Sequence, residues 1–267
     1  MQGDTDMPHD QTIAEIQSRI EHRVLHIAMN RPEKKNALIA PMYLRMAELI
    51  EQAGASSEVR AIYLTGTQAC FCAGNDVTTF TSMEATADGK TPPVRFLEAL
   101  ARCELPVVAA VNGPAIGVGT TLLLHCDFVI AGQDSYFQVP FVQLGVCPEA
   151  GSSFTIPLRM GYHRAAEFLL LGEKLAAQQA LEWGLVNAVH PAADYQSRAL
   201  ALAERLAQQP PTSLRVSKRL LRAPLLREIE LAMAAENASF ATCLNSPEFG
   251  EAIAAFLERR PADFSGF

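Results

Sequence analysis

The sequence has no apolar stretch approaching 18 residues, and it has fewer basic than acidic residues. Without such a stretch, no segment is long enough to cross a bilayer as a helix. The 22 lysines and arginines against 29 aspartates and glutamates give a formal net charge of −7. Because nucleic acids and anionic membrane surfaces attract a positively charged face, we expect neither as a partner.

The sequence also lacks a Cys-x-x-Cys pair and any cysteine and histidine at metal-ligand spacing. Its six cysteines are Cys70, Cys72, Cys103, Cys126, Cys147 and Cys243. The spacing of the first two predicts one side of a strand, and we expect all six to be reduced and at least partly buried, with no metal site. The polar, acidic start resembles no signal or transit peptide, and the final Asp263–Phe267 segment resembles no targeting or lipidation signal. We therefore expect a cytoplasmic protein.

Apolar residues are abundant enough to bury a sizeable core, at 49% of 267 residues. The length corresponds to roughly 1.8 average domains, which means one large domain with an appendage or two small ones. Short apolar strands are predicted at 23–29, 61–66, 106–111 and 128–131, and helices at 41–53, 92–103 and 119–126. This alternation is typical of a layered α/β fold.

After about residue 157 the chain becomes rich in alanine and leucine. Helices are predicted at 164–171, 176–183, 192–209, 213–221, 227–243 and 247–259, with a break at Pro210–Pro211. The pattern indicates an α/β front end followed by an all-helical rear end. Residues 1–12 are predicted to be a disordered tail, 13–200 the core, and 201–267 a separate helical region.

Two glycine-containing turns follow short apolar strands, at Phe71–Val77 and Asn112–Gly119. Glycine lets a ligand approach the backbone closely, and the first N–H groups of a helix have no partner within it. Two such N–H groups aimed at one point would form an oxyanion hole. The alternative is that both are ordinary strand-to-helix turns. Neither is a phosphate-binding P-loop, because no Gly-Lys-Ser/Thr follows.

These segments resemble the crotonase (enoyl-CoA hydratase/isomerase) superfamily. Ala73-Gly74-Asn75-Asp76 resembles its first oxyanion segment, and Asn112–Gly119 its second. Three further similarities are Arg31-Pro32 with Asn36-Ala37-Leu38, Trp183-Gly184-Leu185-Val186 and Phe256–Arg260. The resemblance runs from about residue 15 to 264. It implies a crotonase-like spiral ββα core and a C-terminal trimerisation region, and hence a homotrimer or a dimer of trimers.

The resemblance also implies an acyl-CoA substrate, with CoA as part of the substrate and no separate cofactor. The oxyanion donors fall on the backbone N–H groups of Asn75 and Val118, and the carbonyl that meets adenine falls on Ala73. Phe240 and Arg259 fall where relatives contact CoA. A row of basic residues could meet the CoA phosphates or form a solvated helix face: Arg215, Lys218, Arg219 and Arg222.

The acidic residues distinguish the possible reactions. A hydratase of this superfamily uses two glutamates, and the matching positions here are Thr121 and Phe141. Glu149 instead resembles the single catalytic acid of Δ3,Δ2-enoyl-CoA isomerases, especially the peroxisomal-type subgroup. The implied function is the shift of a 3-enoyl-CoA to a trans-2-enoyl-CoA in fatty acid β-oxidation. A hydratase or related enzyme acting on an unusual acyl-CoA, and a non-catalytic acyl-CoA-binding protein, are the alternatives.

A dry pocket would suit that chemistry. We expect burial to raise the basicity of Glu149, with walls formed by Phe80, Phe137, Phe141 and Leu144. The alternative for Glu149 is an acid that only complements the start of a helix. Asp76 could be a second acid, but its expected role is to hold the first oxyanion turn by capping N–H groups.

Overall fold

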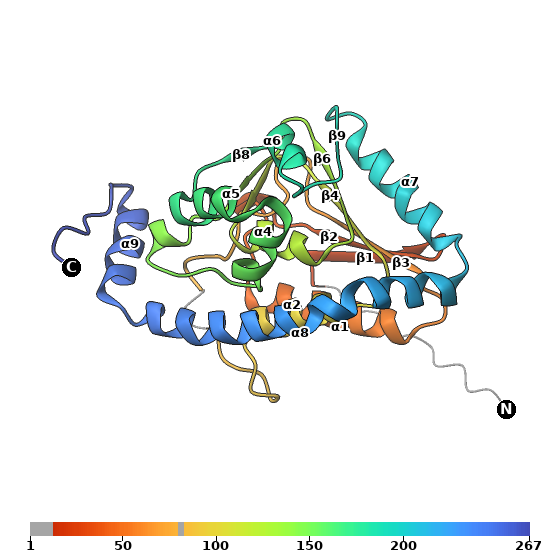
Figure 1. Ribbon diagram of the computed structural model, residues 1–267, viewed down its shortest axis with the longest axis horizontal. Coiled ribbons are helices and arrows are strands. Elements are labelled where there is room, and N and C mark those ends of the chain that lie inside the picture. Colours follow the sequence, from red (N-terminus) through yellow and green to blue (C-terminus); the bar gives the residue numbers. More distant parts are fainter. Residues whose placement is uncertain (1–12, 80–82) are drawn as a thin grey trace.

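The computed structural model describes residues 13–79 and 83–267. It has two sheets with helices packed around them, and the long helix α8 runs along one side (Figure 1). The predicted tail at 1–12 and the predicted wall residue Phe80 lie outside the described residues.

The larger sheet has six strands in the order β1-β2-β3-β4-β6-β9. Strand β1 is antiparallel to β2, and the remaining neighbours pair in parallel. The strands are β1 (Ile16–Glu21), β2 (Val24–Met29), β3 (Ala61–Thr65), β4 (Val107–Val111), β6 (Phe128–Gly132) and β9 (Ala188–His190). The four predicted strands are confirmed, and β1 and β9 are additional.

Helices cover both faces of this sheet. On β3, Ile62 and Leu64 face the main core, which includes α1 (Ala40–Ala55) and α2 (Pro92–Arg102). Ala61 and Tyr63 face the opposite way, toward α7 (Tyr195–Ala207). Because alternate side chains enter two different cores, β3 and β4 are buried along their whole length and read as continuous apolar runs.

A smaller sheet lies next to the oxyanion segments. Its strands are β5 (Pro114–Ile116), β7 (Tyr136–Gln138) and β8 (Leu175–Ala176). Cys72 forms an isolated parallel bridge to Ala115, whereas Cys70 lies in no strand. The predicted strand with both cysteines on one side is therefore wrong, because this stretch pairs with β5 only through the bridge at Cys72. All six cysteines are free thiols.

The rear of the chain is mainly but not entirely helical. Its helices are α4 (Ser152–Met160), α5 (Tyr162–Ala166), α6 (Ala177–Glu182), α8 (Pro211–Leu244) and α9 (Pro247–Glu258). The prediction of an all-helical rear is wrong, because β8 and β9 return to the two sheets. Strands of two or three residues are too short to show a period in sequence.

Three helical predictions also need correction. The predicted helices at 213–221 and 227–243 are one helix, α8, which continues through Pro224. A proline inside a helix removes one N–H bond and crowds the preceding turn, but α8 is anchored on both sides of it, by the buried Lys218 before it and by Ile229 and Met233 after it. The predicted helix at 119–126 is a short α3 (Val118–Thr121) followed by a 3₁₀ turn, Leu122–His125. The predicted helix at 164–171 is the end of α5 followed by a π turn, Glu167–Leu171.

No helix in the described part of the chain combines the length and apolar character needed to cross a membrane. Within residues 13–79 and 83–267, no three histidine, cysteine, aspartate or glutamate side chains form a group that could hold a metal ion.

Candidate active site

The two oxyanion segments lie side by side in parallel. The Cys72 N–H donates to the Pro114 carbonyl at 3.1 Å, and the Ile116 N–H donates to the Cys72 carbonyl at 2.9 Å. Asn75 and Val118 each stand three residues beyond the bridged pair Cys72 and Ala115. The pairing therefore carries both predicted donor residues to the same place.

Glycine allows the close approach at Gly74, and its freedom to adopt a positive φ is used at both Gly74 and Gly117. Gly74 has φ +95°, and a Cβ built on it would lie 3.0 Å from the Ile116 carbonyl oxygen. Gly117 has φ +54°, and a Cβ built there would lie 4.0 Å from the Gly74 Cα atom. The left-handed conformations turn the backbone just before Asn75 and Val118.

The backbone N–H groups of Asn75 and Val118 take no part in the pairing around them. On either side of Asn75, the Gly74 carbonyl accepts from the Leu38 N–H and the Asp76 N–H donates to the Leu38 carbonyl. Val118 is the first residue of α3, where N–H groups lack an intrahelical acceptor. Among the described residues, neither N–H group has a hydrogen-bond acceptor.

Asp76 holds the first turn in place. Its carboxylate accepts hydrogen bonds from the Thr78 N–H at 3.1 Å, the Thr78 hydroxyl at 2.6 Å and Arg31 Nη1 at 2.7 Å. Burial alone would raise its pKa, but these bonds and the Arg31 charge lower it below the usual value. The predicted capping role is therefore confirmed, and an ionised, ion-paired carboxylate is a poor second acid.

Tyr43 is a site residue that the sequence analysis missed. It is fully buried in α1, and its hydroxyl donates to Asn75 Oδ1 at 2.5 Å. Burial raises the pKa of the Tyr43 hydroxyl well above its usual value, and the negative charge of Glu149 adds to this rise. Its helical spacing with the buried Met46, Ala47 and Ile50 was the available signal.

Glu149 lies close to these segments in the turn before α4. It is buried, and its Oε1 atom has no hydrogen-bond partner among the residues that the structure describes. Burial and, secondarily, the charge of Glu236 raise its pKa to about 7, and the Thr121 hydroxyl partly opposes this rise. Thr121 is one turn along α3 from Val118. The expected basicity of Glu149 is thus confirmed.

The N–H groups at the start of α4 are capped by a different carboxylate. Glu236 of α8 accepts hydrogen bonds from the Gly151 N–H at 2.5 Å and the Ser153 N–H at 2.8 Å. The alternative for Glu149, an acid that only complements the start of this helix, therefore makes none of these hydrogen bonds and stays a prediction. The sequence separation between Glu236 and this turn explains why no local pattern revealed it.

The predicted walls all belong to the main core as far as they are described. Phe137 and Phe141 are buried, and Leu144 is partly buried against them. Phe141, which the resemblance predicts at the second glutamate position of a hydratase, is an apolar residue of this core.

The predicted CoA contacts lie in three different parts of the chain. Ala73 is partly exposed immediately before Gly74. Phe240 lies on α8, partly buried against the main core. Arg259 is exposed at the left-handed end of α9, and its side chain forms no ion pair with the described residues. Ala73 therefore lies within the first oxyanion segment, whereas Arg259 lies on the surface.

The basic row on α8 is divided: Lys218 is buried, Arg215 and Arg222 are partly exposed, and Arg219 is exposed. Lys218 is buried, and its Nζ donates to Leu105 O at 2.6 Å and to Asp127 Oδ2 at 2.7 Å. Arg222 donates to the His125 carbonyl at 3.2 Å. Both alternatives for this row, a phosphate site and a solvated face, are therefore wrong for Lys218, because its charge is needed to pair with Asp127.

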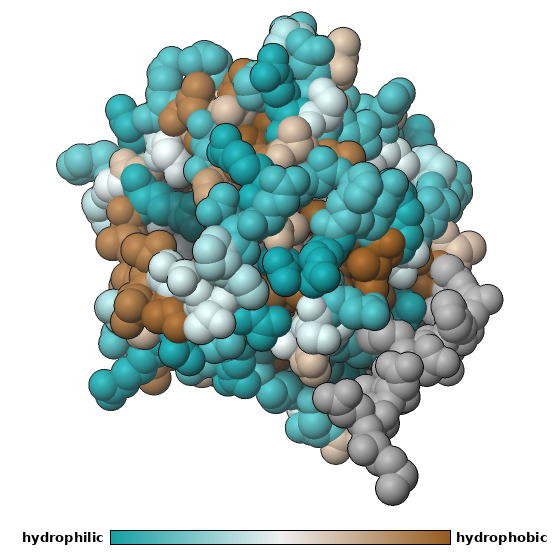
Figure 2. All heavy atoms as spheres, turned by 90° about the vertical axis from the view of Figure 1, so that its right-hand side faces the viewer, coloured by the Kyte–Doolittle hydropathy of each residue, from teal (hydrophilic) through white to brown (hydrophobic). Residues whose placement is uncertain are grey.

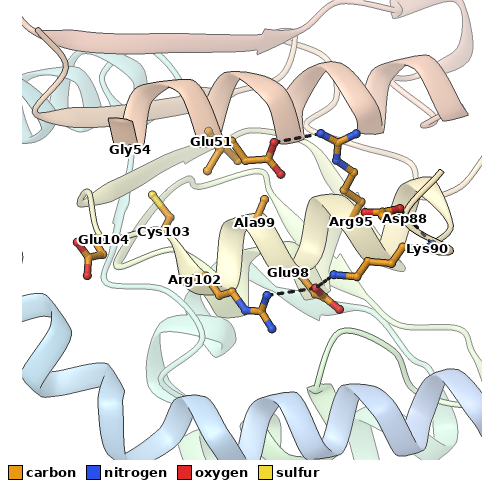
Figure 3. A pocket seen from close by; sticks show the side chains of 11 residues that line it. Glu51, Gly54, Asp88, Lys90, Arg95, Glu98, Ala99, Arg102, Cys103 and Glu104 are labelled. Atoms are coloured by element: carbon orange, nitrogen blue, oxygen red, sulfur yellow. Dashed lines mark hydrogen bonds and ion pairs between the residues drawn. The ribbon is translucent and has the colours of Figure 1, made fainter. Parts of the chain in front are cut away.

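A hollow of about 300 Å³ lies between α1 and α2 (Figure 3). Its basic side chains are already paired: Lys90 with Glu98, Arg95 with Glu51, and Arg102 with Glu98 and Glu230. None of the oxyanion residues or Glu149 lines it. This hollow is separate from the candidate site, and its charges are compensated internally.

Comparisons with known proteins agree with this geometry. The family model for enoyl-CoA hydratase/isomerase matches residues 19–266. The chain is 35% identical over 246 residues to "Enoyl-CoA delta isomerase 2" of Rattus norvegicus, covering 90% of this chain and 63% of the rat protein. It is 34% identical to a "Probable enoyl-CoA hydratase" of Rhodobacter capsulatus, covering 94% of this chain and 98% of that protein.

Among solved structures, an enoyl-CoA hydratase/isomerase from Pseudoalteromonas atlantica superposes with a TM-score of 0.90 at 40% identity. The match covers 94% of this chain and all of that chain. The protein is therefore a crotonase-fold enzyme of the enoyl-CoA hydratase/isomerase family.

Proposed function

We propose that the enzyme shifts the double bond of a 3-enoyl-CoA to give a trans-2-enoyl-CoA, with Glu149 as the only acid–base group. The observation that carries this proposal is the buried Glu149 carboxylate, which has a free oxygen and a pKa raised to about 7. Thr121 and Phe141, at the two hydratase positions, cannot act as carboxylate bases.

The reaction requires one proton to leave C2 and one to return at C4. Glu149 takes the C2 proton, and negative charge moves onto the thioester oxygen as a dienolate forms. The N–H groups of Asn75 and Val118 stabilise that oxyanion, as preorganised donors do in a site that excludes water. Protonated Glu149 then gives its proton to C4, so the carboxylate is regenerated and no group is consumed.

A carboxyl group with a pKa near the working pH suits both halves of this cycle. It must be ionised to take the first proton and acidic enough to return it. Isomerisation needs no activated water, so a single acid is sufficient. The name of the Rattus norvegicus relative supports this choice, whereas that of the Rhodobacter capsulatus relative supports hydration as the alternative.

A pair of substrates separates the two reactions. With trans-3-hexenoyl-CoA we expect the absorbance of a conjugated enoyl thioester to appear. With crotonyl-CoA we expect that absorbance to persist, because no second carboxylate activates water. Rapid loss of the crotonyl-CoA signal without conversion of hexenoyl-CoA would establish hydration. Binding of both without turnover would establish a non-catalytic acyl-CoA-binding protein.

The exposed apolar side chains of α8 support a further proposal, that residues 201–267 form a trimer interface. Leu220 and Leu221 are 68% and 76% exposed, and Leu231 is 56% exposed. The face turned to the viewer in Figure 2 is mainly hydrophilic, with hydrophobic groups gathered in a few patches. We expect light scattering after gel filtration to give three or six chain masses, and Leu221→Asp to lower that mass. A wild-type mass of one chain would contradict the proposal.

A cytoplasmic location and a role in β-oxidation stay predictions.

A further inference from the structure

The mechanism above leaves one buried acid without a role. Glu236, on α8, is only 6% exposed, and it is not needed for proton transfer. Its two carboxylate oxygens bind the turn that carries Glu149. Oε2 accepts from the Gly151 N–H, and Oε1 accepts from both the N–H and the hydroxyl of Ser153, at 2.8 and 2.5 Å.

The N–H groups of Gly151 and Ser153 can only donate, and the Ser153 hydroxyl donates in this arrangement. A carboxylate can accept all three bonds at once, whereas a protonated carboxyl could keep its proton bonded here only if the Ser153 hydroxyl turned to accept it. The N-terminus of α4 adds the positive end of its dipole at the same place. Burial raises the pKa of Glu236, and the bonds from Ser153 and Gly151 oppose that rise. The bonding pattern thus favours the charged form of Glu236.

The turn itself has an uncommon backbone. Ala150 has φ +62° and Gly151 has φ +69°. An alanine in the left-handed region persists only where its surroundings hold it, and such residues cluster at functional sites. Two distant groups hold it here: Glu236 bonds the residues that follow, and His125 Nε2 bonds the Ala150 carbonyl at 2.9 Å. Because a carbonyl can only accept, this His125 nitrogen carries the proton.

No cation separates the two acids. The groups that act on Glu149 are Tyr43 from α1, Thr121 from α3, Cys72 from the first oxyanion segment and Glu236. Those facing Glu236 are Ser153 and Cys147 from the turn, and Glu149. His125, behind Ala150, is held neutral by burial and by Arg222, with its pKa lowered to about 3. Among these described neighbours, none brings a positive charge against either carboxylate.

We propose that Glu236 is a positioning residue for Glu149: its carboxylate binds the Gly151 and Ser153 groups and so holds the turn that aims the Glu149 carboxylate. The inference rests on the proposed function, in which Glu149 is the base. Burying two acids without a cation costs stability. We therefore expect Glu236 to have a role in the reaction that offsets this cost.

The test is the pH profile of isomerisation in wild type, Glu236→Gln and Ser153→Ala. The rate rises with pH as Glu149 ionises. Removing the neighbouring charge in Glu236→Gln should move the midpoint of this rise to lower pH by about one unit and lower the plateau, because the base is weaker. A role limited to structure would lower the plateau and leave the midpoint where it is in wild type, which would overturn the inference.

Ser153→Ala is the matched control and keeps the inference testable if Glu236→Gln does not fold. It keeps both carboxylates and the two N–H bonds to Glu236 and removes only the hydroxyl donor, so the turn is held less firmly. The plateau of the rate should then fall. An unchanged plateau would count against a positioning role for Glu236.

Glu149→Gln separates the two ideas. If wild type converts no 3-enoyl-CoA, or if Glu149→Gln keeps its activity, the proposed function fails. If activity depends on Glu149 and the midpoint in Glu236→Gln equals that of wild type, only the role of Glu236 fails.

Discussion

Replacing Glu149 with glutamine is expected to lower kcat for 3-enoyl-CoA isomerisation by about 10²–10⁴-fold, the usual contribution of a placed acid–base group. Glutamine has nearly the same shape but cannot take the C2 proton. Since the oxyanion donors are backbone groups, acyl-CoA binding should change little. Initial rates at saturating trans-3-hexenoyl-CoA and a calorimetric Kd measure the two effects separately.

Glu173→Gln is the control for this substitution. Glu173 is an exposed glutamate whose side chain forms no ion pair with the described residues, so the same chemical change there should leave kcat unaltered. If Glu149→Gln retains wild-type kcat, the proton must be moved by another group and the single-acid mechanism is wrong.

Replacing Val118 with proline is expected to lower kcat by about 10²–10³-fold, the usual effect of deleting one oxyanion donor. Proline removes the N–H group, and it is well tolerated at the first residue of a helix, where Val118 lies. The dienolate then keeps only the donor at Asn75. Rates and thermal unfolding should be compared in the same preparations.

Val118→Ala controls for the loss of the buried valine side chain, because it keeps the N–H group. We expect it to lower the melting temperature but to retain most of kcat. Equal losses of kcat in the alanine and proline variants would show that packing, and not the N–H group, supports catalysis.

Much of the fold could be predicted because its signals are local. The strand at 107–111 is an uninterrupted apolar run, and α1 and α2 show helical spacing. Short segments such as β9 could not be predicted, because only pairing with β6 extends them. The continuous helix α8 was hidden by Pro224, whose penalty is overcome by packing along the rest of the helix.

The site divides in the same way. The sequence by itself determined the two glycine turns, and its resemblance to the family predicts Asn75 and Val118 as the donor residues and Glu149 as the acid, since each lies in a short motif. Only the tertiary structure decided how these groups are tuned. Tyr43 reaches Asn75 from α1, and Glu236 reaches the α4 turn from α8. The pKa of a buried carboxyl depends on the solvent it loses and on the charges that distant segments bring beside it, and neither is encoded in neighbouring residues.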